Sequence, residues 1–176
     1  MATQKYKEKM KYPVKFKGKT IKQVTKLNLS GKNLSVFPEN VFDYPNLTKL
    51  VLSNNRIKVI PKEILKLKKL KVLDMANNEI KVLQGAVFRL PKLRTLNLYG
   101  NQIRMFPKQF AESSIRKVVV SMNPLEDGEL ERLREKCEVI CATNNIETNT
   151  ESTIIVHETP SRKNEEGIVT FQEKRR

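Results

Sequence analysis

The 176-residue sequence carries 34 lysines and arginines against 19 aspartates and glutamates, a formal net charge of +15, and 39% of its residues are hydrophobic. No apolar run approaches the roughly 20 residues of a transmembrane helix, and two cysteines are too few for a disulfide-rich secreted scaffold. The basic charge favours an anionic partner or surface, although lysines at ordinary solvent-facing positions would produce the same composition.

The first predicted element is a basic segment over residues 1–23. It contains eight lysines, among which larger apolar or aromatic side chains are spaced at Tyr6, Tyr12, Val14 and Phe16. We expect it to cover the first unit of the region that follows. Interleaved aromatic and basic residues also occur in nucleic-acid-binding proteins, but no recognised motif of that kind is present. The segment lacks an apolar block, which predicts no secretory signal and a cytoplasmic location.

A 23-residue repeat occupies residues 24–123. Positions one, four, six and eleven of each unit are apolar, and position nine is asparagine in every unit except the first, which has Lys32. The fifth unit begins one residue early, and the five units start at Val24, Leu47, Leu70, Leu93 and Ile115. Self-similarity of this length predicts stacked coils, because a single unit cannot bury its apolar side alone.

The pattern L-x-x-L-x-L-x-x-N-x-L resembles the leucine-rich repeat. Three units continue in the same family style, with Val36–Pro38, Val59–Pro61 and Met105–Pro107, whereas the third has Leu83 and Gln84 there. The resemblance implies an α/β solenoid with a short parallel β-sheet on its concave side. It also implies an irregular or short-helical convex side, and caps at both ends.

The asparagines at position nine are predicted to be structural. An amide side chain carries two donors and an acceptor, so at the turn that leaves each strand it can bond backbone groups of two successive coils. An asparagine-lined ligand site is the less favoured alternative. The predicted ladder consists of Asn55, Asn78, Asn101 and Asn123.

The predicted partner-binding surface is the concave face, where strand alternation places the side chains that flank the buried leucines. Tyr99 is a large aromatic at position seven, where other units have serine or alanine, and Tyr and Arg are frequent at binding hot spots. Ordinary solvated strand positions are the alternative interpretation. The predicted residues are Lys26, Asn28, Lys49, Val51, Lys71, Val72, Asp74, Arg94, Thr95, Asn97, Tyr99, Arg116, Lys117 and Val119.

Residues 62–73, KEILKLKKLKVL, also have the pattern of a basic amphipathic helix that could bind a membrane. The repeat register accounts for these leucines better than a helix does, because Leu70 and Leu73 are the first two apolar positions of the third unit. The register also places Leu65 at the same unit position as Phe42 and Phe88, which predicts that all three belong to the core.

Residues 124–143 are predicted to form a C-terminal cap. Leu130, Leu133 and Cys137 follow helical spacing, and acidic residues precede basic ones as the helix dipole favours. A last strand is expected over Val139–Cys141. The order resembles the helix-then-strand element that closes bacterial leucine-rich repeats, and it would cover the apolar edge of the fifth coil.

Cys137 and Cys141 are predicted to be buried free thiols. A zinc site needs further ligands, and the single histidine, His157, lies in the tail. A catalytic cysteine would need a neighbouring base, which the sequence does not supply. The tail, residues 144–176, contains STIIVHET and GIVTFQEK, which could pair as a hairpin. We favour a flexible tail, since termini are poorly ordered unless tied down.

The sequence contains no glycine-rich phosphate loop, no carboxylate pair with a plausible pocket, and no nucleophile with a base. It therefore predicts a monomeric, non-enzymatic protein–protein interaction module that needs no metal or other cofactor. Its partner would be a protein, with an acidic surface matching the basic concave side. The alternative is a basic scaffold for nucleic acid or an anionic membrane, whose binding would weaken steeply with salt.

Overall fold

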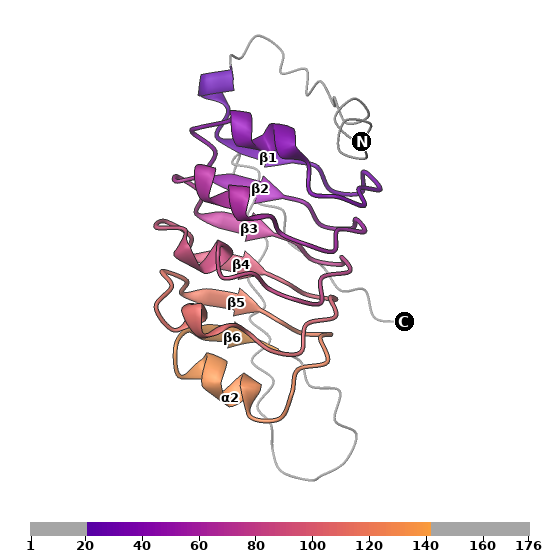
Figure 1. Ribbon diagram of the computed structural model, residues 1–176, viewed down its shortest axis with the longest axis vertical. Helices are drawn as coiled ribbons and strands as arrows, with labels where there is room; N and C mark the ends of the chain where they lie inside the picture. Colours follow the sequence, from indigo (N-terminus) through magenta and orange to yellow (C-terminus); the bar gives the residue numbers. More distant parts are fainter. Residues whose placement is uncertain (1–20, 142–176) are drawn as a thin grey trace, which may run out of the picture. The chain divides into compact units, whose positions relative to one another are not determined.

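The computed structural model describes residues 21–141. The segment before residue 21 and the tail from residue 142 lie outside the described residues, so the N-terminal capping role and the form of the tail stay predictions. Six short strands form one parallel sheet whose spatial order follows the chain (Figure 1). They are β1 (Lys26–Asn28), β2 (Lys49–Val51), β3 (Val72–Asp74), β4 (Thr95–Asn97), β5 (Lys117–Val119) and β6 (Glu138–Ile140).

Residues at the same unit position pair across neighbouring strands, so the repeat sets the register of the sheet. The middle residues of the strands align in one row, and those of β1 to β5 are buried. The row consists of Leu27, Leu50, Leu73, Leu96, Val118 and Val139. Each turn of the chain therefore returns to the sheet one strand further along, which is the predicted solenoid.

Position eight, in the turn three residues after each of β1 to β5 ends, has a left-handed backbone conformation. Glycine and asparagine tolerate positive φ better than other residues, and four of the five units have one of them at this position. Gly100 is constrained twice, because the amide oxygen of Asn77 also occupies the space that a Cβ would need. The residues and φ angles are Gly31 (65°), Asn54 (56°), Asn77 (51°), Gly100 (62°) and Met122 (58°).

Short 3-10 helices form the return side of the coils. In three coils a proline comes directly before the helix, with φ between −73° and −68°, which is the value that the proline ring imposes. The third unit, which lacks this proline, has Ala86 there instead. The helices are η1 (Ile21–Gln23), η2 (Glu39–Asp43), η3 (Lys62–Lys66), η4 (Val87–Arg89) and η5 (Lys108–Phe110).

The prediction that Leu65 belongs to the core is wrong, because its residue is 36% exposed. Side chains three apart lie on one face of a 3-10 helix, and in η3 the inward face is taken by Ile64 and Leu67. At the same unit position as Leu65, Phe88 is buried and Phe42 is only partly buried. The core thus contains unit positions eighteen and twenty-one, which the helical geometry selects.

The C-terminal cap contains both predicted elements. Helix α2 (Glu129–Arg134) packs the fully buried Leu133 against the core, and β6 then pairs with β5 in parallel, one residue earlier than predicted. Cys137 and Cys141 are free, as expected, but they are partly exposed rather than buried. Partial burial still raises the pKa of both thiols, which disfavours the reactive thiolate.

Candidate protein-binding surface

The position-nine asparagines are bonded to the backbone of two successive coils. Asn55 Oδ1 accepts the N–H groups of Lys32 and Leu34 at 3.0 Å each. Its Nδ2 donates to the carbonyl oxygens of Leu29 and Leu52, at 3.0 and 2.8 Å. The buried amide therefore satisfies backbone groups that the turn would leave without partners.

The same arrangement repeats in the next three coils. Asn78, Asn101 and Asn123 each accept one N–H from the preceding coil, at 3.0 to 3.1 Å. Each also donates to a carbonyl of the preceding coil and to carbonyls of its own coil. These amides hold the coils together and are not presented to a ligand.

Unit positions three and five flank the buried middle residue of each strand and form two rows on the outer face of the sheet. Most of these side chains are exposed or half-buried. The position-three row is Lys26, Lys49, Val72, Thr95, Lys117 and Glu138, and the position-five row is Asn28, Val51, Asp74, Asn97, Val119 and Ile140. Strand β6 thus extends both predicted rows by one residue.

Three polar residues of the position-five row form side-chain hydrogen bonds with the backbone of the turn that follows their own strand. The side-chain oxygens of Asn28, Asp74 and Asn97 each accept the backbone N–H two residues further on, at 2.9 to 3.1 Å. Asp74 is also buried, at 7% exposure. Burial raises the pKa of this carboxyl, against the lowering effects of the Ala76 N–H and of Lys49. These three predicted residues shape the surface more than they offer polar groups to a partner.

Arg94, predicted as a binding residue, is partly engaged within the solenoid. Its Nη1 donates to the carbonyl oxygens of Pro91, Leu93 and Ser114, at 3.3, 3.1 and 3.1 Å. The contact with Ser114 joins the beginning of the fourth unit to its last residue, just before the fifth unit starts. Lys71 and Arg116, at the same unit position, are exposed.

The basic residues of the position-three row lie near both ends of the sheet. Lys26 is exposed, and Lys49 and Lys117 are half-buried. Lys117 Nζ lies 2.7 Å from Glu138 Oε1, an exposed pair of the kind that contributes little to stability. A partner carboxylate could therefore replace Glu138 at small cost.

Tyr99 is 36% exposed at position seven. The other side chains in this column are small, and the hydroxyls of Ser30 and Ser53 bond each other at 3.0 Å. Within the described coils, Tyr99 is the one large aromatic side chain at this position. It extends beyond the serine and alanine positions of the column and offers a ring with a polar tip.

A second set of exposed side chains was missed by the sequence interpretation. Position thirteen is apolar in four successive units, and these residues are 48% to 69% exposed. We call Val36, Val59, Val82 and Met105 the apolar column. The signal was visible in the sequence, since each directly precedes an apolar residue that is buried: Phe37, Ile60, Leu83 and Phe106.

The residues 21–141 contain no cluster of three or more His, Cys, Asp or Glu side chains that could hold a metal ion. Within the same range, no helix has the length and apolar character that crossing a membrane requires. The exposed rows on the sheet and the apolar column are therefore the features of the described chain that suggest binding.

Comparison with known proteins agrees with this architecture. The family model described as leucine rich repeat matches residues 45–103. A solved leucine-rich repeat protein of Leptospira interrogans is 36% identical, with a TM-score of 0.56. The match covers 60% of this chain and 28% of the Leptospira chain, so the sequence spans less than a third of that protein. No curated protein matches the sequence. The repeat register, the six-stranded parallel sheet and these matches show that the chain is a leucine-rich repeat protein.

Proposed function

We propose that the concave face of the sheet binds a protein partner that carries an acidic surface. Leucine-rich repeat domains are generally protein-binding modules, and they are typically non-enzymatic. The observation that carries the proposal is the pair of outward-facing rows on a sheet whose register is fixed in every coil. A preordered surface of this kind loses little conformational entropy when a partner binds.

The surface offers two kinds of contact. Tyr99 provides an aromatic anchor just beyond β4, and Val72 and Val119 add apolar positions on the neighbouring strands β3 and β5. The basic residues lie to either side of it along the stack, with Lys26, Lys49 and Lys71 towards the N-terminal end and Arg116 and Lys117 towards the other. An acidic partner surface with a pocket for the tyrosine ring would complement both features.

The proposal is tested with a partner recovered by crosslinking in native lysate and then purified. Tyr99→Ala should weaken binding by about 2 kcal/mol or more if the ring is a hot spot. Lys49→Glu should mainly slow association, because charge steers encounter.

The control for charge is Lys68→Glu, an exposed lysine outside the sheet. Lys66 is a poorer control, since its Nζ lies 5.9 Å from the Phe42 ring centroid. A partner that tolerates Tyr99→Ala and Lys49→Glu would place the binding site elsewhere.

A salt titration separates this proposal from binding to nucleic acid or an anionic membrane. Phosphate contacts make affinity fall steeply with salt, whereas a site centred on Tyr99 should keep most of its affinity. The monomeric state and the cytoplasmic location stay predictions, which sedimentation and cell fractionation would check.

A further inference from the structure

We propose a second docking surface, centred on the apolar column, for an amphipathic helix of a partner protein whose polar flank is acidic. It is distinct from the concave face, because unit position thirteen lies on the return segment between the asparagine turn and the 3-10 helix. The surface would let the solenoid hold two segments at once, one on the sheet and one on the return side.

The first observation is continuity. Val36, Val59, Val82 and Met105 are 50%, 48%, 69% and 57% exposed. Backbone hydrogen bonds of 2.8 to 3.0 Å join the neighbouring coils just before the column, from Arg56, Glu79 and Gln102 to the residue at position eleven of the preceding coil. Single exposed apolar side chains are ordinary, but a continuous row on a fixed backbone marks an interaction surface.

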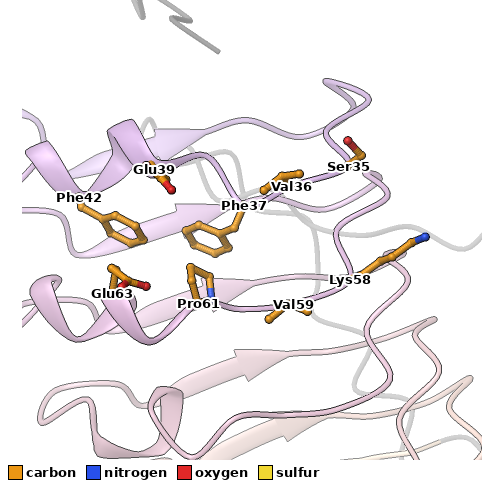
Figure 2. Close-up of a pocket in the computed structure, with 9 residues that line it drawn as sticks. All are labelled: Ser35, Val36, Phe37, Glu39, Phe42, Lys58, Val59, Pro61 and Glu63. Atoms are coloured by element: carbon orange, nitrogen blue, oxygen red, sulfur yellow. The ribbon is translucent and has the colours of Figure 1, made fainter. Parts of the chain in front are cut away.

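The second observation is a groove at the N-terminal end of the column. It has a volume of about 390 Å³ and lies between the first and second coils. Val36, Val59, Pro61 and the stacked rings of Phe37 and Phe42 form its apolar lining, and Ser35, Lys58, Glu39 and Glu63 complete it. Figure 2 shows Val36 and Val59 on adjacent return segments, with both phenylalanine rings further along the groove. One large apolar side chain of a docked segment would fit there as an anchor.

The spacing of the column favours a helix over an extended strand. Strands that are joined by backbone hydrogen bonds lie about 4.8 Å apart. The backbone hydrogen bonds between coils just before the column indicate a similar interval between its side chains. A helix brings one apolar side chain to the same face every turn, about 5.4 Å. A strand does so every second residue, about 6.7 Å. A helix of about three turns would therefore contact all four residues.

The charge beside the column selects an acidic helix. Unit position twelve is basic in three successive coils, and these exposed residues, Lys58, Lys81 and Arg104, form a basic flank one residue from the column. Glu79 lies 3.7 Å from Lys58, in a pair exposed to solvent. Acidic side chains on one edge of the helix would meet this flank. A second copy of the chain is disfavoured as occupant, because the net charge of +15 opposes self-association.

The test uses the full chain and a displayed library of helical peptides of about 18 residues, with leucines at i, i+4, i+7 and i+11 and randomised positions elsewhere. Selected peptides should carry aspartate or glutamate along one edge of the leucine face. Their affinity should fall about tenfold or more for the double variant Val59→Ser, Val82→Ser. Both valines are largely exposed, so this variant should keep the wild-type denaturation midpoint.

Matched variants distinguish binding at the apolar column from non-specific attraction of acidic peptides to a basic protein. Lys81→Glu should weaken the selected peptides about tenfold, whereas Lys68→Glu makes the same charge change away from the column and should leave affinity unchanged. Tyr99→Ala, on the concave face, should also leave it unchanged. Failure of Tyr99→Ala to affect any protein partner would contradict only the concave-face proposal.

Three results would overturn the second surface. One is a selection that enriches no peptide, or enriches peptides with a basic edge. Another is affinity that the double serine variant does not change. The third is a concentration-dependent dimer in sedimentation that the double serine variant abolishes, because the column would then be an interface between copies.

Discussion

Single residues at fixed unit positions decide how one coil connects to the next. The position-nine amide serves backbone groups of two coils, and position eight turns the chain with positive φ. Met122 departs from the second rule, because it holds φ of 58° without being glycine or asparagine. A left-handed conformation costs about 1–2 kcal/mol for most residues, which the surrounding cap must offset. The positive φ at position eight is therefore imposed by the packing of the coils as well as by the residue type.

Asn78→Ala should lower the free energy of unfolding by about 1–3 kcal/mol. The substitution leaves the Ile57 N–H and the Leu52 and Met75 carbonyls without their amide partner in the interior. Denaturant unfolding measures the effect. The exposed amide of Gln102 provides the control, since Gln102→Ala should change stability by less than about 0.5 kcal/mol. Equal effects of the two substitutions would contradict a structural role for the ladder.

Asp74→Asn should stabilise the protein at neutral pH. Burial raises the pKa of the Asp74 carboxyl above its ordinary value of 3.8, so the folded chain binds this proton more tightly than the unfolded chain. The wild type therefore loses stability as pH rises from about 3.8 through the higher folded-state pKa, and the deficit remains at pH 7. Asn28 and Asn97 make the same turn bond, so asparagine fits the position.

The measurement is the difference in unfolding free energy between Asp74→Asn and wild type, followed from pH 3 to 7. The difference should be small at the acidic end and grow in favour of asparagine as pH rises. Curves that stay parallel over the whole range would show that the Asp74 carboxyl has no raised pKa in the folded state.

At the scale of elements, the cap closes the stack of described coils by supplying side-chain partners to the backbone. Glu129 Oε1 accepts the Phe106 N–H at 2.7 Å, and Arg132 Nη2 donates to the Phe106 carbonyl at 2.7 Å. The two side chains also bond each other, at 2.6 and 2.9 Å. A short helix thus satisfies both backbone groups of a residue in the fourth coil.

Glu129→Ala should cost about 1–3 kcal/mol, because it leaves the Phe106 N–H without its carboxylate partner in a buried place. The matched control lies on the same helix: Glu131 and Arg134 have the same spacing, but their pair is exposed and 4.0 Å long. Glu131→Ala should therefore change stability by less than about 0.5 kcal/mol. Thermal or denaturant unfolding of both variants would show whether α2 caps the stack through Glu129.

At the scale of the whole molecule, the described coils share one core and depend on closed ends. Truncation after Asn123 removes α2 and β6, which exposes the edge of β5 and the side chains that Leu133 covers. We expect that chain to aggregate, since solenoids need capping units for solubility. Truncation after residue 149 keeps the cap and should have a much smaller effect. Equal light scattering by the two truncated chains would contradict the cap assignment.

The sequence alone determined the architecture, because one period of 23 residues sets the strand positions, their register and the buried rows at the same time. Leu27, Leu50 and Leu73 occupy equivalent places because each unit must bury the same face against its neighbours. The concave rows follow from strand alternation, so their membership was predictable as well. The period also revealed the asparagines, whose chemistry suits a turn between coils.

Only the tertiary structure decided how individual side chains are used. Asp74 is buried, Arg94 is bonded to Ser114, and Glu129 reaches Phe106, 23 residues away in sequence. A repeat pattern predicts which face a residue occupies. Whether its side chain is buried or hydrogen-bonded depends on the atoms of the segments that pack against it. Leu65 points outward for the same reason: 3-10 geometry gave the inward face to Ile64 and Leu67, and no unit position could state that beforehand.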